Sequence, residues 1–459
     1  MKLRTREGHA LRLTPDHLVL SVSERTRYRR ETEWRKAQDL RPGDEIVLHN
    51  NADLTEWAGP HSQSEGYLIG LLLGDGTLKT DKAILGAWDP MVAKVANGET
   101  LQSHGVRTMM DAAHAAALTL PHRADFSGWL TVAGQPGHYR LALGALKTLA
   151  HELGMAPGNK TLTPEIERCS SAFYRGFLRG LFDADGSVQG AQAKGVSVRL
   201  TQVSLAVLEG TQRMLGRLGI NSTIYRNRRA GGPRALPDGK GGSKEYLTQP
   251  LHELIISGAN LATFATRIGF SDADKGERLK QSLNAYQRTL NRDRFVATVE
   301  SLEEDGIEAV YDVTVSEVHA FDANGLYVHN CAEQPLPPYG CCCLGSIDLT
   351  KFVKNPFAEN NVFDFEHFGK VVTVATRMLD NVLDVTAWPL KQQHEEAMNK
   401  RRVGLGFTGL GDALIMLRLR YDTLEARQMA AKISEAMRDH AYRASAELAR
   451  EKGAFPLFN

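Results

Sequence analysis

The segment Phe177-Leu178-Arg179-Gly180-Leu181-Phe182-Asp183-Ala184-Asp185-Gly186 repeats, without a gap, the pattern of Tyr67-Leu68-Ile69-Gly70-Leu71-Leu72-Leu73-Gly74-Asp75-Gly76. Each copy predicts an apolar helix that has a glycine in the middle of one face and ends in an aspartate and a glycine. A single Asp-Gly pair is usually a turn. Two copies inside a longer repeat indicate a shared structural role. Because glycine has no Cβ, the central Gly70 and Gly180 would let the two helices pack backbone to backbone.

Close packing of the two helices would set Asp75 and Asp185 side by side. Adjacent carboxylates repel each other and are stable together mainly when a hard divalent cation such as Mg²⁺ bridges them. Water bound to such a metal attacks phosphate readily. The repeat continues to Lys160 and Lys275, which follow the two aspartates at 85 and 90 residues. The alternative for each lysine is a solvated surface charge.

These motifs resemble those of the two-motif LAGLIDADG homing endonucleases that inteins carry. The resemblance implies that Asp75 and Asp185 bind Mg²⁺ and that Lys160 and Lys275 stabilise the cleaved phosphate. It also implies that the partner is double-stranded DNA, at a homing site within the host gene.

The segment 225–246 is rich in glycine and carries six basic and two acidic residues. The basic residues are Arg226, Arg228, Arg229, Arg234, Lys240 and Lys244. Because strand-like runs flank the segment, it predicts a long hairpin laid along a DNA groove. A solvated loop is the alternative.

Strand-like alternation of apolar and polar residues marks both ends of the region before residue 331. The alternating runs are 10–13, 18–22, 45–48, 295–299, 309–315 and 326–330. The pair Asn324-Gly325 predicts a hairpin turn before the last run. Thr14 and His17 place a hydroxyl and an imidazole beside the second run, where they could hold and protonate a peptide group.

Thr14-Pro15-Asp16-His17, the segment 34–44 and Leu326-Tyr327-Val328-His329-Asn330 resemble motifs of the Hint fold of inteins. The resemblance implies that Thr14 and His17 assist the first acyl shift and that Asp312 and His319 tune proton transfers. It implies that His329 assists Asn330, which cyclises to a succinimide and releases Cys331. These residue types suit the reaction, because an amide side chain can attack its own backbone carbonyl and a thiol is a good acyl acceptor.

The chain departs from the intein pattern at its start. Met1 stands only thirteen residues before Thr14, so the family's first nucleophile is absent. We therefore expect at most C-terminal cleavage between Asn330 and Cys331. Complete splicing would require an upstream fragment that joins in trans.

The region from residue 331 onward differs in character. Cys331-Ala332-Glu333 and the downstream Cys341-Cys342-Cys343-Leu344-Gly345-Ser346-Ile347 resemble the active-site strand of ribonucleotide reductase large subunits, most closely the adenosylcobalamin-dependent class. The resemblance implies a thiyl radical on Cys331, acid–base chemistry by Glu333, and Cys342 as one of the thiols that supply reducing equivalents. It also implies a ribonucleotide substrate, a thiol reductant and adenosylcobalamin. Cys343 stands where the family usually has asparagine, so the choice of redox thiol among Cys341, Cys342 and Cys343 stays open, as does the di- or triphosphate level of the substrate.

Composition describes ordinary globular material. The 459 residues have a net charge of +1 and a hydrophobic content of 42%, which excludes a disordered or strongly basic chain. Four of the five cysteines lie between residues 331 and 343, which favours redox or nucleophilic chemistry in a reducing compartment. Neither an apolar run of 18 residues nor a signal-peptide core is present. We expect a soluble cytoplasmic protein with no membrane partner.

Together these features predict a multidomain chain. An all-β Hint domain (1–54 and 290–330) is split by an α/β LAGLIDADG endonuclease of two repeats (55–289). An α/β, mostly helical fragment of the ribonucleotide reductase barrel (331–459) follows. The alternative function is a DNA-binding or homing endonuclease remnant whose splicing and reductase parts are inactive.

Overall fold

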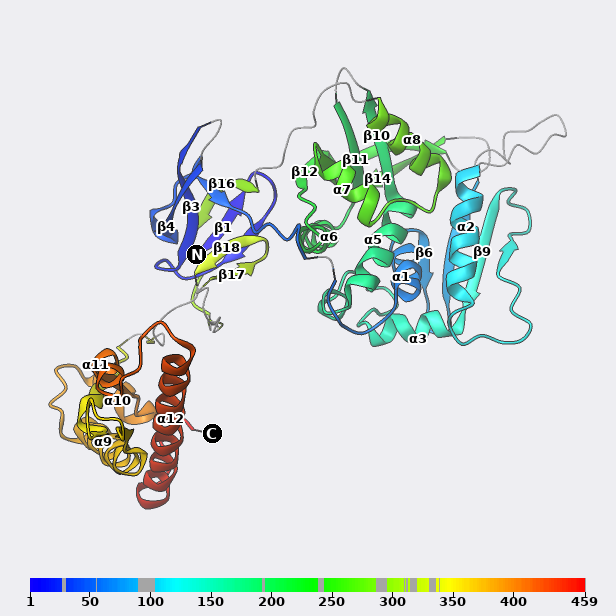
Figure 1. Cartoon of the computed structure of the whole chain (residues 1–459). Helices are drawn as coiled ribbons and strands as arrows, with labels where there is room; N and C mark the ends of the chain where they lie inside the picture. The colour runs from blue at the N-terminus through cyan, green and yellow to red at the C-terminus, as the bar shows by residue number, and fades with distance from the viewer. Residues whose placement is uncertain are drawn as a thin grey trace. The chain divides into compact units, whose positions relative to one another are not determined.

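The computed structural model describes residues 1–26, 30–54, 56–89, 104–191, 195–237, 243–285, 295–308, 310, 313, 320–329, 336–337 and 339–458. The chain folds as two compact units, Met1–Cys331 and Ala332–Asn459, which Figure 1 shows in colours that run along the chain. Each unit has its own buried core.

One β-sheet of the first unit is built from two distant parts of the sequence. Its strands are β1 (Lys2–Thr5), β2 (Ala10–Arg12), β3 (Leu18–Arg25), β4 (Arg30–Lys36), β5 (Glu45–Val47), β16 (Val296–Glu303), β17 (Ala320–Ala323) and β18 (Leu326–His329). The order is β17-β18-β3-β5-β16-β1-β2, and β4 pairs with β3. Leu3, Ile46 and Val328 are fully buried in the same core. The strands from the first 48 residues and those from Val296 to His329 therefore share one sheet and one core.

The predicted strands at 10–13, 18–22, 45–48, 295–299 and 326–330 are confirmed, with ends shifted by a few residues. The predicted strand 309–315 lies largely outside the described residues. Asn324 and Gly325 both have positive φ, 54° and 87°, and Ala323 pairs with Leu326. This geometry confirms the predicted hairpin.

Two long helices form the centre of the remainder of the first unit. They are α1 (Gln63–Asp75) and α5 (Ser171–Asp185), which pack along each other. A β-strand begins immediately after each helix. The strands β6 (Gly76–Leu78), β7 (Ala83–Trp88), β9 (His138–Leu143) and β8 (Trp129–Thr131) form one sheet, in that order. The strands β10 (Gly186–Ala191), β11 (Gly195–Gln202), β15 (Leu251–Ser257) and β12 (Thr223–Arg229) form the other.

Glycines let the two helices approach closely. A Cβ added to Gly70 would lie 2.1 Å from the carbonyl oxygen of Phe177, and one added to Gly180 would lie 2.3 Å from that of Tyr67. The predicted backbone-to-backbone packing is therefore confirmed. Gly66 and Gly176, one turn earlier, show the same contact at 2.2 and 2.0 Å.

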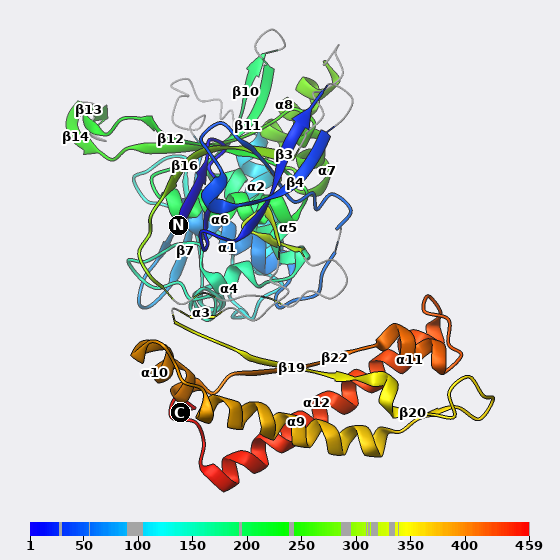
Figure 2. The same ribbon diagram turned by 90° about the vertical axis from the view of Figure 1, so that its left-hand side faces the viewer.

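Further helices and a pair of strands surround this helix pair. They are α2 (His104–Ala117), α3 (Gly144–Glu152), α4 (Pro164–Glu167), α6 (Leu205–Arg217), α7 (Asn260–Arg267), α8 (Ala273–Asn284), and the paired strands β13 (Gly232–Pro237) and β14 (Ser243–Thr248). Figure 2 shows β13 and β14 as a narrow ribbon that continues from β12. The predicted hairpin is therefore present.

The second unit is mostly helical. Its longer elements are β19 (Cys343–Asp348), α9 (Phe365–Val385), α10 (Lys391–Lys400), β22 (Val403–Thr408), α11 (Leu410–Met416) and α12 (Leu424–Lys452); η3 (Leu349–Phe352), β20 (Val353–Lys354) and β21 (Val362–Phe363) connect them. The strands β19 and β22 pair in parallel. The helices α9 and α12 each bury an apolar face, which includes Phe368, Val372 and Leu379 in α9 and Ile433, Met437 and Leu448 in α12.

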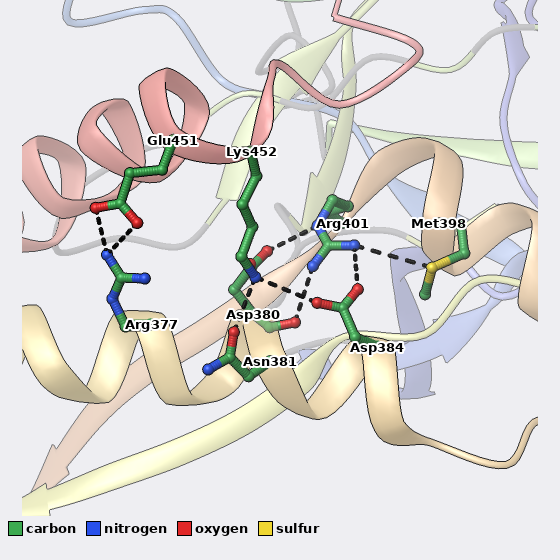
Figure 3. A network of polar contacts seen from close by, with 8 residues as sticks. All are labelled: Arg377, Asp380, Asn381, Asp384, Met398, Arg401, Glu451 and Lys452. Atoms are coloured by element: carbon green, nitrogen blue, oxygen red, sulfur yellow. Dashed lines mark hydrogen bonds and ion pairs between the residues drawn. The ribbon is translucent and has the colours of Figure 1, made fainter.

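A polar network joins α9 to the ends of α10 and α12 (Figure 3). The Arg401 guanidinium, which follows α10, donates to Asp380 and Asp384, each at 2.7 Å. The Lys452 ammonium at the end of α12 donates to the same two carboxylates. These contacts hold the pKa values of Asp380 and Asp384 below their usual range. The network fixes the ends of three helices.

Among the described residues, no helix combines the length and the apolar character needed to cross a membrane.

Candidate functional site

Asp75 and Asp185 are the last residues of α1 and α5, so the glycine-mediated packing brings the two helix ends together. The Asp185 carboxylate lies against Gly74, because a Cβ added to Gly74 would be 3.1 Å from Asp185 Oδ2. Burial, followed by the negative charge of Asp75, raises the pKa of Asp185. Gln202 in β11 donates a hydrogen bond to Asp185 Oδ2 at 2.6 Å. The structure thus places the exposed Asp75 close enough to the partly buried Asp185 for their like charges to interact.

Lys160 and Lys275 lie at the same helix ends. The Lys160 ammonium donates to the carbonyl oxygens of Gly74 and Gly76, at 3.2 and 2.7 Å. Lys275 likewise donates to the carbonyl oxygens of Phe182 and Asp183. Burial lowers the pKa of both lysines. Asp185 and Asp75 oppose this shift at Lys160, whereas Asp272 and Asp183 oppose it most at Lys275. Both lysines are thus partly buried, and their ammonium groups bond to backbone carbonyls.

Sequence reasoning missed several polar residues at this position. Asp183 is 3% exposed and accepts a hydrogen bond from the Tyr67 hydroxyl at 2.8 Å. Its signal was visible, because an acid stands two residues before Asp185 where the first repeat has Leu73. Gln202 had no such signal, since only the pairing of β11 with its neighbours brings it to the helix end.

The oxygen donors at the two helix ends are of the type that a hard divalent cation binds. Asp75 and Asp185 offer carboxylate oxygens, and Mg²⁺ commonly binds through one or two carboxylates while keeping several waters. Within the described ranges, no group of three or more His, Cys, Asp or Glu side chains is placed to hold a metal ion. A cation here would therefore rely on two carboxylates, water and substrate oxygens.

Two family models match the chain. A LAGLIDADG-like domain matches residues 172–269, and the barrel domain of ribonucleotide reductase matches residues 246–459. The chain combines a LAGLIDADG-like homing endonuclease domain with a ribonucleotide reductase barrel domain. The barrel match begins before the second unit, which starts at residue 332.

Similar proteins include two reductases. The chain is 26% identical over 485 aligned residues to the ribonucleoside-diphosphate reductase NrdEB subunit alpha of Bacillus subtilis, covering 98% of this chain and 42% of the relative. It is 39% identical over 128 residues to the vitamin B12-dependent ribonucleoside-diphosphate reductase of Thermoplasma acidophilum, covering 28% and 16%. The chain thus spans less than half the length of these relatives. A solved structure of mesophilic variants of the homing endonuclease I-DmoI shows 17% identity and a TM-score of 0.27, covering 45% of this chain and 94% of that one.

The LAGLIDADG-like domain carries the basic hairpin. Arg234 on β13 and Lys244 on β14 are exposed, and Arg234 stands opposite Tyr246. Arg226 and Arg228 near its base instead form ion pairs with Glu209 and Glu253, at 3.7 and 3.5 Å. Lys240 lies outside the described residues. Arg229, on β12, is also exposed, so exposed basic side chains lie on β12 as well as on β13 and β14.

The sheet that contains β3 and β18 brings together some of the residues predicted to take part in splicing. Val328 in β18 pairs with Val19 in β3, so His329 and His17 come to the same end of the sheet. Thr14 is one turn away, because its carbonyl accepts from the His17 N–H at 3.2 Å. The Trp34 ring meets the His329 ring edge-on, with centroids 4.9 Å apart. This tryptophan contact was not predicted.

The predicted residues Asp312, His319, Asn330, Cys331 and Glu333 lie outside the described residues.

In the reductase barrel domain, Cys341, Cys342 and Cys343 are free, partly exposed thiols. The Cys342 sulfur lies over Gly404 of β22, where an added Cβ would be 3.2 Å away. Burial raises the pKa values of Cys341 and Cys343. Only Cys343 belongs to β19, and the charges of the neighbouring thiols contribute to the raised pKa values of Cys341 and Cys343.

Proposed function

We propose that the LAGLIDADG-like domain cleaves both strands of a specific DNA site in a metal-dependent reaction. The observation that carries this proposal is the convergence of Asp75, Asp185, Lys160 and Lys275 at the ends of two glycine-packed helices. Asp75 and Asp185 would hold the cation. A bound Mg²⁺ would neutralise the two carboxylates and make a water more acidic near the phosphodiester.

The protein's own residues have separate roles in this proposal. Gln202 orients the Asp185 carboxylate through its 2.6 Å hydrogen bond. Lys160 and Lys275, held on helix carbonyls, would stabilise the extra negative charge on phosphate as it is attacked. Each strand break consumes one water, whose oxygen bonds to phosphorus while one bridging P–O bond breaks and a proton passes to the leaving oxygen.

Replacing Arg234 and Lys244 together with alanine is expected to weaken DNA binding and to reduce the salt dependence of affinity. Each phosphate contact that is lost should lower the slope of log K against log salt concentration by about 1. Titration of a labelled duplex at several salt concentrations checks this.

Glu245→Gln is the matched control for the hairpin variant, because it lies on the same strand and removes a negative charge. It should leave affinity unchanged or raise it. An unaltered salt slope in the Arg234 and Lys244 double variant would show that the hairpin does not contact DNA.

We also propose that residues 1–54 and 290–330 form a Hint domain around an endonuclease at 55–289, followed by the reductase part at 331–459. The single sheet made from both flanking segments supports this assignment. In this proposal Thr14, His17, Asp312 and His319 assist acyl and proton transfer. His329 assists cyclisation of Asn330, which breaks the Asn330–Cys331 peptide bond and leaves an amine on Cys331.

His329→Ala is expected to slow release of residues 331–459 by about 10²-fold, because positioned general acid–base groups contribute at least that much. Timed mass spectrometry of the purified chain measures the release, with Asn330→Ala as the blank. His151→Ala, on the exposed end of α3, should match the parent. Equal release from the Asn330→Ala chain would contradict cyclisation.

For the reductase part, we propose that Cys331 carries the thiyl radical, that Glu333 is its acid–base partner and that Cys342 supplies reducing equivalents to a ribonucleotide. The free thiols at residues 341–343 fit a reaction that needs reduced cysteines. Adenosylcobalamin would generate the radical, and we assign no described residue to its binding. A thiol reductant would be a further partner, and the cytoplasm is the expected location.

A second candidate function is DNA binding without cleavage. The exposed basic hairpin would serve it as well as it serves an endonuclease. Mg²⁺-dependent cutting of a duplex that carries the uninterrupted reductase sequence separates the two functions, because a binding module would retain the duplex uncut.

A further inference from the structure

Asp183 is a buried carboxylate that the proposed cleavage reaction does not use. It accepts hydrogen bonds from the Tyr67 hydroxyl at 2.8 Å and from the backbone N–H groups of Ser271 and Asp272 at 3.0 and 3.2 Å. A buried carboxylate is costly unless it is hydrogen-bonded, and this one is bonded from three sides. It therefore joins α1, α5 and the segment that begins α8.

The next contact leads to Lys275. The Asp272 side chain caps α8 by accepting from the N–H groups of Asp274 and Lys275, each at 3.0 Å. The Lys275 ammonium then returns to the carbonyl oxygens of Phe182 and Asp183. The contacts therefore run from the Asp183 side chain through Asp272 to Lys275. The Lys275 ammonium bonds in turn to the Asp183 carbonyl oxygen, which fixes the lysine in place.

The half of the site around Asp75 and Lys160 lacks the equivalent of every side chain in this network. In the register of the repeat, Leu73 stands in place of Asp183, Phe177 in place of Tyr67, and Pro157 in place of Asp272. Lys160 is not on a helix but between α3 and α4. It bonds directly to the carbonyls of Gly74 and Gly76. Both ammonium groups thus bond to backbone carbonyls at a helix end, but only Lys275 is also held through Asp272 and the buried Asp183.

We propose that Asp183, oriented by Tyr67, is a positioning residue for Lys275 in one half of the site only, and that the two DNA strands are consequently cut at unequal rates. This inference rests on the proposed endonuclease function. It goes beyond that function by assigning the difference in cleavage rate between the two DNA strands to one buried contact network.

Strand-specific cleavage of a doubly labelled duplex tests the proposal. Asp183→Asn should slow one strand 10- to 100-fold, as loss of groups that orient a functional side chain commonly does, and leave the other within about twofold. The strand that slows should be the one that Lys275→Met slows more. In the Lys275→Met background, Asp183→Asn should not slow the cleavage of either strand any further. Equal slowing of both strands, or additive effects, would overturn the proposal.

Tyr67→Phe is the milder companion variant, because it keeps the ring and copies Phe177 of the other repeat. It should slow the same strand by a smaller factor, and it replaces Asp183→Asn if that variant does not fold. No effect on either strand would count against the network.

A readout that needs no cleavage separates failure of this proposal from failure of the endonuclease function. Acylation of lysine amines, followed by peptide mass spectrometry, should show higher reactivity of Lys275 in Asp183→Asn and unchanged reactivity of Lys160. If the parent chain cuts no DNA but this change is seen, the positioning role stands without the nuclease. Unchanged reactivity of Lys275 would refute the positioning role.

Discussion

Asp75→Asn and Asp185→Asn are each expected to lower the rate of DNA cleavage by about 10²- to 10³-fold, while DNA binding is retained. The two carboxylates are the only acidic side chains assigned to the cation, and loss of one preorganised electrostatic contact costs about 10²- to 10³-fold. Because the hairpin that carries Arg234 and Lys244 is separate from the helix ends, affinity for the duplex should change little. Chelation of divalent cations should abolish cleavage by the parent chain.

The measurement compares single-turnover cleavage with duplex binding for the same variants. Asp81→Asn is the matched control, since Asp81 is exposed and near Lys82 in the turn between β6 and β7. It should cleave at the parental rate. Full cleavage by Asp75→Asn would remove Asp75 from the metal site and with it the main support for the proposed reaction.

Gly70→Ala is expected to destabilise the first unit by about 3 kcal/mol, which lowers Tm by about 10 °C. The new Cβ would lie 2.1 Å from the Phe177 carbonyl oxygen, a backbone atom that can move only if the two helices separate. Separation also moves Asp75 away from Asp185, so cleavage should fall together with stability. Thermal unfolding and cleavage of the same preparation check both effects.

Gly216→Ala provides the control for this substitution. Gly216 lies in α6, and a Cβ added there meets no atom within 4 Å. Alanine should therefore raise stability by up to about 1 kcal/mol through its higher helix propensity. An unchanged Tm in Gly70→Ala would show that the helix interface is looser than the contact distance indicates.

Much of the fold could be predicted because its signals are local. The repeated helices with Gly70 and Gly180 follow from apolar periodicity and the absence of a side chain, and the Asn324-Gly325 hairpin follows from two residues that tolerate positive φ. The strand β4 could not be predicted. Its residues are mostly charged and exposed, so pairing with β3 rather than an apolar pattern makes it a strand.

Some features of the candidate site could likewise be predicted from the sequence, and others could not. Asp75, Asp185, Lys160 and Lys275 could be selected from the spacing of a repeat, since each repeat places its own residues at equivalent points. The burial of the lysines depends on contacts that span 84 to 93 residues. The sequence left open whether each lysine is a solvated surface charge. The contacts show the environment of both ammonium groups.

The amino-acid sequence by itself determined the two-helix repeat, the paired aspartates, the basic hairpin and a boundary near residue 331, where the second compact unit begins. Only the tertiary structure decided that Asp183, Tyr67 and Gln202 belong to the site and that His17 and His329 share one end of a sheet. The physical reason is separation along the chain. Periodicity and turn chemistry act over a few residues, whereas hydrogen bonds to buried groups are chosen by whichever distant segment the packed core brings within reach.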